Sequence, residues 1–77
     1  MKIKYFAVIR EKLKKEEEEF DFKGSVAQLR QFLIENYPEL EPIFRVSLFA
    51  VNEEYVGEDY IIKGDERVAL IPPVSGG

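Results

Sequence analysis

The C-terminal segment is the part of this sequence best suited to chemistry. The last residues read Pro72-Pro73-Val74-Ser75-Gly76-Gly77 and follow the apolar run Val68-Ala69-Leu70-Ile71. Glycine has no side chain, so a Gly-Gly end can pass through a narrow slot and bring its carboxyl group close to another molecule. The two prolines stiffen the backbone before it and favour an extended path. We therefore expect the carboxyl group of Gly77 to be the reacting group, although an ordinary frayed chain end is the alternative.

Other catalytic groups are scarce in this sequence. It contains no cysteine and no histidine, which excludes disulfides, thiolate metal sites and a catalytic triad. No loop has the ligand spacing of a calcium site, so we expect no bound metal. Gly64-Asp65 is too short for a phosphate-binding loop and indicates a hairpin turn. We therefore expect the chain to bind neither a cofactor nor ATP by itself.

Size and charge limit the partners. Seventy-seven residues support one domain, and the net charge of −4 argues against nucleic acid. An acidic protein favours a positively charged protein groove as its partner surface. No apolar stretch is long enough to span a bilayer and no secretory leader is visible, so we expect no membrane association and a cytoplasmic location.

The first part of the chain indicates a hairpin whose strands are joined by a helical connection. Residues 3–9 are rich in β-branched and aromatic side chains and predict a first strand. Residues 10–15 form a polar turn or short helix, and residues 17–22 predict a second strand. The four glutamates at 16–19 indicate a solvated strand entry, with an acidic docking patch as the alternative.

Residues 25–37 predict the main helix. Ser25 is a suitable N-cap, and Gln28 stands three residues later, as in a capping box. Pro38 ends the helix, because the residue before a proline disfavours helical backbone. The apolar stripe of this helix indicates core packing and consists of Val26, Leu29, Phe32, Leu33 and Tyr37.

The rest of the chain predicts three more strands. We expect a helical turn at 42–44, strands at 46–51, 55–56 and 67–71, and turns at 52–54 and 63–66, with 57–62 irregular. One helix with one apolar stripe needs a sheet to cover it. The sequence therefore predicts an α+β protein with a β-grasp architecture, in which a mixed sheet curls around one main helix and the first and last strands are parallel neighbours at its centre. The domain spans residues 1–73, followed by a flexible tail, residues 74–77.

An exposed apolar patch is expected beside the exit of this tail. Phe6 and Ile71 lie on the two predicted central strands and together with Pro72 and Pro73 form the predicted partner interface. If Phe6 and Ile71 share the face away from the helix, they have no cover within the chain, which is typical of a protein interface. The alternative is that the sheet curls and buries them as core. Arg10 and Glu11 are a polar rim or a solvated charge pair.

The whole chain resembles the small subunit of molybdopterin synthase, a ubiquitin-like sulfur carrier. The segments that carry this resemblance are Tyr5-Phe6-Ala7-x-Ile9-Arg10-Glu11, Ala50-Val51-Asn52, Gly64-Asp65-Glu66-x-Val68-Ala69 and Ile71-Pro72-Pro73-Val74-Ser75-Gly76-Gly77. The resemblance implies that a partner of the ubiquitin-activating type, an adenylyltransferase, uses ATP to adenylate Gly77. A sulfur donor protein then leaves a thiocarboxylate there.

The resemblance also implies a destination for this sulfur. The tail of Val74, Ser75, Gly76 and Gly77 enters the large synthase subunit and gives sulfur to a pterin precursor, precursor Z (cyclic pyranopterin monophosphate), in an assembly of two carriers and two large subunits. Catalysis is then expected in the large subunit, not in this chain. Carriers for thiazole synthesis or tRNA thiolation share the Gly-Gly end, as do ubiquitin-like protein modifiers. An interaction module with an inert tail is the remaining alternative.

Overall fold

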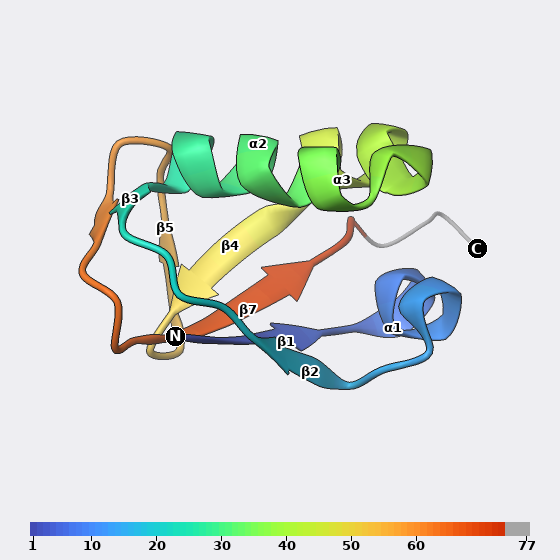
Figure 1. The fold of residues 1–77 in the computed structure, drawn as a ribbon, viewed down its shortest axis with the longest axis horizontal. Helices are drawn as coiled ribbons and strands as arrows, with labels where there is room; N and C mark the ends of the chain where they lie inside the picture. The colour runs from blue at the N-terminus through green and yellow to red at the C-terminus, as the bar shows by residue number, and fades with distance from the viewer. Residues whose placement is uncertain (74–77) are drawn as a thin grey trace.

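A five-stranded mixed sheet forms the centre of the molecule, and the computed structural model describes residues 1–73 (Figure 1). Its strands are β1 (Lys2–Tyr5), β2 (Glu17–Glu19), β4 (Leu48–Val51), β5 (Glu54–Val56) and β7 (Arg67–Ile71). They lie in the order β2-β1-β7-β4-β5. β1 and β7 pair in parallel, whereas the other neighbours pair antiparallel. The prediction that the first and last strands are parallel neighbours is therefore confirmed.

Helix α2 (Val26–Asn36) lies against one side of this sheet, together with the 3-10 helix η1 (Pro38–Leu40) and helix α3 (Glu41–Val46) (Figure 1). The predicted capping box is present. The Ser25 hydroxyl accepts the Gln28 N–H at 3.1 Å, and the Gln28 side-chain oxygen accepts the Ser25 N–H at 2.9 Å. Pro38 opens η1 directly after α2, as expected for a residue that cannot continue a helix.

The core lies between α2 and the sheet. The predicted stripe of α2 supplies three fully buried side chains and two partly buried ones. Alternate residues of β1, β4 and β7 face the helix, as the period of a strand requires. The side chains that these four elements contribute to the core cluster are Ile3, Tyr5, Val26, Leu29, Leu33, Ile34, Phe49, Val51, Val68 and Leu70. The predicted β-grasp architecture is confirmed.

The first strand is shorter than predicted. It ends at Tyr5, and Ala7–Leu13 form helix α1, so the expectation of a strand over residues 3–9 was wrong. Ala7 has φ 50°, which turns the chain out of the strand. Val8, Ile9 and Leu13 all contact the core. Neighbouring residues such as 8 and 9 can share a helix face, whereas in a strand they point to opposite faces. The helical connection between β1 and β2 is confirmed but starts earlier.

The second strand is also shorter than predicted, because β2 covers only Glu17–Glu19 of residues 17–22. Phe20 and Phe22 instead pack on Phe32 of α2, whose ring centroid lies 5.3 Å from that of Phe20 and 5.4 Å from that of Phe22. These aromatic contacts draw the chain away from the edge of the sheet toward the helix layer.

A small second sheet was not predicted. The segment expected to be irregular, residues 57–62, contains β6 (Ile61–Ile62), which pairs antiparallel with β3 (Gly24–Ser25). These strands have two residues each, which is too short for alternation to reveal them. Their pairing fixes the start of α2.

Candidate functional site

The strand that leads to the C-terminus lies in the middle of the sheet. β7 is hydrogen-bonded on one side to β1 and on the other to β4. After Ile71, Pro72 is buried and Pro73 is exposed. The segment predicted to react comes next, and its residues Val74, Ser75, Gly76 and Gly77 lie outside the described residues. The predicted reacting segment is therefore attached to a strand that is hydrogen-bonded on both sides.

The side of the sheet away from α2 is called the outer face here. Residues opposite each other in a strand pair place their side chains on the same face. Ala69 of β7 pairs with Lys4 on one side and Ala50 on the other, and Ile71 pairs with Leu48. Within each strand these residues alternate with those of the core cluster, so they belong to the outer face, where Ala50 is nevertheless only 6% exposed. Tyr55 of β5 pairs with Ala50 and extends the outer face to the edge of the sheet.

Phe6 and Ile71 share the outer face, which was the condition set for a partner interface. Phe6 is not on a strand, which corrects its predicted position, but its backbone is extended with φ −129° and ψ 155°. Its ring lies 5.5 Å from the Lys4 ammonium, and both Phe6 and Ile71 are half-buried. The alternative of full burial in the core is therefore wrong. That a partner binds here stays a prediction.

Two further apolar residues of the outer face were not predicted as site residues. Leu48 is 55% exposed and Tyr55 is 69% exposed. Leu48 lies opposite Ile71 and so stands beside the exit of the tail. The alternation of residues 46–51 in the sequence does not show which face of the sheet Leu48 occupies. The register between β4 and β7 places it on the outer face. Exposed apolar side chains that lie together commonly mark a binding surface.

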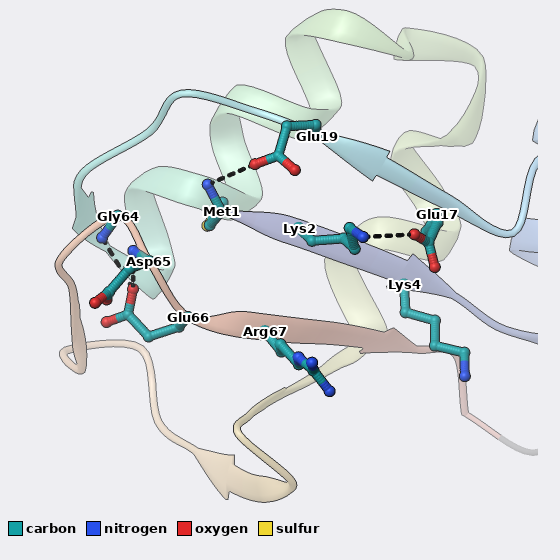
Figure 2. Close-up of a pocket in the computed structure, with 9 residues that line it drawn as sticks. All are labelled: Met1, Lys2, Lys4, Glu17, Glu19, Gly64, Asp65, Glu66 and Arg67. Carbon is teal, nitrogen blue, oxygen red and sulfur yellow. Dashed lines mark hydrogen bonds and ion pairs between the residues drawn. The ribbon is translucent and has the colours of Figure 1, made fainter.

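A shallow polar pocket of about 490 Å³ lies at the far end of the outer face from Ile71 (Figure 2). Two ion pairs cross it, from the N-terminal amine of Met1 to Glu19 at 3.1 Å and from Lys2 to Glu17 at 3.0 Å. Within residues 1–73 no group of three or more acidic side chains is arranged to hold a metal ion. The residues that line the pocket are Met1, Lys2, Lys4, Glu17, Glu19, Gly64, Asp65, Glu66 and Arg67.

The turn before β7 is held by the carboxylate of Glu66. Its oxygens accept the backbone N–H groups of Lys63 at 2.8 Å, Gly64 at 2.9 Å and Asp65 at 3.1 Å. The hydrogen bond from Lys63, followed by those from the rest of the turn, holds the pKa of Glu66 below its usual value despite its burial. Residues 63–66 therefore form the predicted turn, but the prediction of a hairpin was wrong, because the turn joins β6 and β7, which belong to different sheets. The amide groups of the turn are used internally and not for a phosphate.

Glu18 is the exception among the four glutamates predicted to be solvated. It is half-buried and accepts the hydroxyl hydrogens of Tyr5 at 2.8 Å and Tyr37 at 2.7 Å. Lys15 lies 3.4 Å from its carboxylate. Burial alone would raise the pKa of Glu18, but the hydrogen bonds from Tyr37, Tyr5 and Lys15 outweigh it and lower this pKa. Glu16, Glu17 and Glu19 are exposed, as predicted.

Comparison with known proteins adds to this geometry. The model of the ThiS family matches residues 3–77. The chain belongs to the ThiS family. Among curated relatives of this ThiS-family chain, the molybdopterin synthase sulfur carrier subunit of Caenorhabditis elegans is 33% identical over 81 aligned positions, covering all of this chain and 96% of the relative. That of Chlamydomonas reinhardtii is 35% identical over 82 positions, covering all of this chain and 98% of the relative.

Solved structures agree with the fold of this ThiS-family chain. A Pyrococcus furiosus protein named as subunit 1 of a molybdopterin converting factor superposes with a TM-score of 0.77 at 26% identity, covering 95% of both chains. A complex of subunits 1 and 2 of the molybdopterin-converting factor from Helicobacter pylori contains a chain that matches with a TM-score of 0.69 at 22% identity, covering 99% of this chain and 96% of that one. The latter likeness concerns the fold alone. The resemblance inferred from the sequence motifs is confirmed.

In residues 1–73, no helix is both long enough and apolar enough to cross a membrane.

Proposed function

We propose that this protein is the sulfur carrier of molybdenum cofactor biosynthesis and acts through the carboxyl group of Gly77. One observation carries the proposal: full-length relatives are named as molybdopterin synthase sulfur carrier subunits, and the family match runs through Gly77. In this proposal the chain offers a reacting group and leaves catalysis to its partners in the cytoplasm.

Activation of Gly77 is needed because a carboxylate is a poor electrophile. Its oxygen attacks the α-phosphorus of ATP in a partner adenylyltransferase, which releases pyrophosphate and forms an acyl-adenylate. A sulfur nucleophile then attacks the carbonyl carbon, so a C–S bond forms, the C–O bond to the adenylate breaks, and AMP leaves. With hydrosulfide as the nucleophile, the products are a thiocarboxylate, AMP and one proton.

The fold gives this reactive end its reach and its support. Four residues follow Pro73, and fully extended they span about 13 Å. That length lets the thiocarboxylate enter a buried site in the large synthase subunit while the domain stays outside. There the thiocarboxylate sulfur forms a C–S bond to precursor Z while a C–O bond at the same carbon breaks and its oxygen takes up a proton. Water then cleaves the resulting thioester, which releases the Gly77 carboxylate and leaves the sulfur on the pterin. Two sulfur atoms make the dithiolene, which suits an assembly of two carriers and two large subunits. A large-subunit partner is supported by the relatives from Caenorhabditis elegans and Chlamydomonas reinhardtii, which are named as subunits of molybdopterin synthase.

The test is the intact mass of the chain after incubation with ATP, the adenylating partner and hydrosulfide. We expect a gain equal to the exchange of one oxygen for one sulfur, located at Gly77 by fragmentation. A matched variant with one alanine added after Gly77 should show no gain, because the activated position is moved. A second variant, Gly76→Val, should block passage of the tail through a narrow slot.

Two results would contradict the proposal. One is an unchanged mass when the same partner activates a known carrier in parallel. The other is full sulfur transfer by the extended variant. Branched Gly-Gly remnants on lysines of cellular proteins, with no thiocarboxylate, would instead identify a protein modifier.

A further inference from the structure

The two prolines after β7 continue the strand beyond its last paired residue. Along β7 and the prolines, buried positions alternate with more exposed ones, and the buried ones are Val68, Leu70 and Pro72. This is the period of a strand, so Pro72 lies on the core side with Leu70, and the exposed Pro73 lies on the side of Ile71. Pro72 is therefore covered by the chain itself and presents little surface to a partner, although the sequence placed it in the predicted partner interface.

The position of Pro72 suits a residue without an N–H group. The pairing of β7 with β4 ends at Ile71. The same register places Ser47 next on that side, but the Ser47 carbonyl already accepts the Arg30 guanidinium at 2.7 Å. On the β1 side the Phe6 carbonyl accepts two N–H groups of α1, at 3.1 and 3.3 Å. A buried N–H at position 72 would thus meet carbonyl groups that are already bonded, and proline has no N–H to satisfy.

The two prolines also restrict rotation of the backbone. A proline ring holds φ near −65°, and the residue before a proline is restricted to extended backbone. Ile71 and Pro72 each precede a proline. Rotation is therefore restricted without a break from β7, which is hydrogen-bonded on both sides, to Pro73. The direction in which the chain leaves Pro73 is set by the folded domain.

We propose that Pro72 is a positioning residue for sulfur transfer, because its buried ring sets the place and the direction from which Gly77 is delivered. The inference rests on the proposed function, in which the thiocarboxylate of Gly77 reacts inside a partner. Restricting the direction of a tethered group raises its effective concentration at a site without adding a contact to that site. Loss of Pro72 should therefore slow the transfer step and leave docking unchanged.

The test is single-turnover sulfur transfer from the thiocarboxylated chain to precursor Z at saturating large synthase subunit. Intact mass verifies equal loading of each variant, calorimetry gives Kd for the subunit, and circular dichroism melting verifies folding. Pro72→Gly should lower the transfer rate constant about tenfold while Kd keeps its native value. Pro72→Val should fall between the two, because valine keeps an apolar side chain suited to a strand but adds an N–H and frees φ.

Two other prolines supply matched controls. Pro42 is exposed at the start of α3, so Pro42→Ala should transfer sulfur at the native rate. Pro73→Ala removes an exposed ring directly beside the buried one and should retain most of the native rate. Equal loss in Pro73→Ala and Pro72→Gly would show that the exposed ring matters as much and would contradict the assignment to Pro72.

The remaining outcomes separate the two proposals. Native rate constants for both Pro72→Gly and Pro72→Val contradict the positioning role and leave the carrier function standing. A weaker Kd with an unchanged rate constant would assign Pro72 to the partner interface and overturn the inference. A native chain that is loaded with sulfur but transfers none to precursor Z contradicts the proposed function, and this inference with it.

Discussion

Replacing Arg30 by methionine should destabilise this protein more than any other single change at a surface arginine. The guanidinium group of Arg30 donates to the backbone carbonyls of Phe44 at 2.6 Å and Ser47 at 2.7 Å, at the end of α3. Its centre lies 4.9 Å from the Phe49 ring, and its side chain is only 16% exposed. A pair of hydrogen bonds also joins it to Glu58, at 3.1 and 2.6 Å. Arg30 therefore ties α2 to α3, β4 and the segment before β6.

The magnitude follows from the two carbonyl groups. A hydrogen bond from a charged donor contributes about 1.5–3 kcal/mol. Methionine keeps the apolar contact with the Phe49 ring but donates nothing, so both carbonyls lose their charged partner. We expect a loss of about 3 kcal/mol in the free energy of unfolding, after allowing for water at the exposed side. The ion pair with Glu58 adds little to this figure, because Glu58 is 54% exposed. For a domain of this size such a loss lowers Tm by about 12–24 °C.

Urea unfolding followed by circular dichroism measures this effect, with Arg45→Met as the matched control. Arg45 is 60% exposed and pairs with Glu41 within one helix, so its loss should cost only about 0.5 kcal/mol. Arg30→Lys should resemble Arg30→Met, because one ammonium group cannot reproduce the planar arrangement of donors. If Arg30→Met costs less than about 1 kcal/mol, or no more than Arg45→Met, the reasoning that Arg30 joins the helix layer to the sheet is refuted.

Three further predictions concern other parts of the molecule. Glu18→Gln should destabilise the protein at neutral pH and have a smaller effect in acid. Because folding lowers the pKa of Glu18, its contribution to stability is present above the unfolded pKa, about 4.3, and is lost as pH falls through the folded pKa. Urea titrations from pH 7 to pH 3 would contradict this if the difference in unfolding free energy between native chain and variant stayed constant. Gly24→Ala should lower the free energy of unfolding by about 1–3 kcal/mol, because φ of Gly24 is +147° and the added Cβ would lie 2.6 Å from the Gln28 side-chain oxygen of the capping box. An unchanged thermal melting temperature would disprove this. Leu48→Asp should alter the free energy of unfolding by no more than about 0.5 kcal/mol yet weaken binding to the large synthase subunit in calorimetry. If the variant binds with the affinity of the native chain, Leu48 does not belong to the partner interface.

Most of the fold could be predicted because its elements carry local signals. The capping box at Ser25 and Gln28, the apolar stripe and Pro38 delimit α2 within the sequence itself. The apolar runs at the two ends of the chain predict a parallel central pair, which the structure contains. In each case the local preference and the tertiary packing favour the same structure, as expected for a sequence that specifies one fold.

The errors occurred where local signals compete or are too short. Residues 3–9 have strong β propensity, yet Val8 and Ile9 both contact the core, which neighbouring residues of one strand could not do, so packing decided the structure of α1. The pairing of Gly24–Ser25 with Ile61–Ile62 involves two residues on each side. Glu18 stands among three exposed glutamates, and only the approach of Tyr5 and Tyr37 from other elements makes it a half-buried acceptor.

Only those residues of the candidate site whose face follows from alternation within a single segment could be predicted from the sequence. Alternation suggested that Phe6 and Ile71 share an open face, and the structure agrees although Phe6 follows the strand. Leu48 and Tyr55 could not be assigned, because their faces depend on the register between strands far apart in the sequence. The polar pocket that Lys2 and Arg67 line was missed for the same reason, since these residues, 65 positions apart, become neighbours only through the parallel pairing of β1 with β7.

This parallel pairing also places the predicted partner interface beside the point where β7 ends. Parallel strands run in the same direction, so Leu70 lies opposite Tyr5, and Ile71 and Phe6 are the next residues of the two segments. Leu48 lies opposite Ile71 on the other side of β7. A partner bound to these side chains would therefore lie beside the point from which the chain continues to Gly77. Charging Leu48 should therefore disturb docking without changing the chemistry at Gly77, whereas altering Gly76 should stop transfer without changing docking.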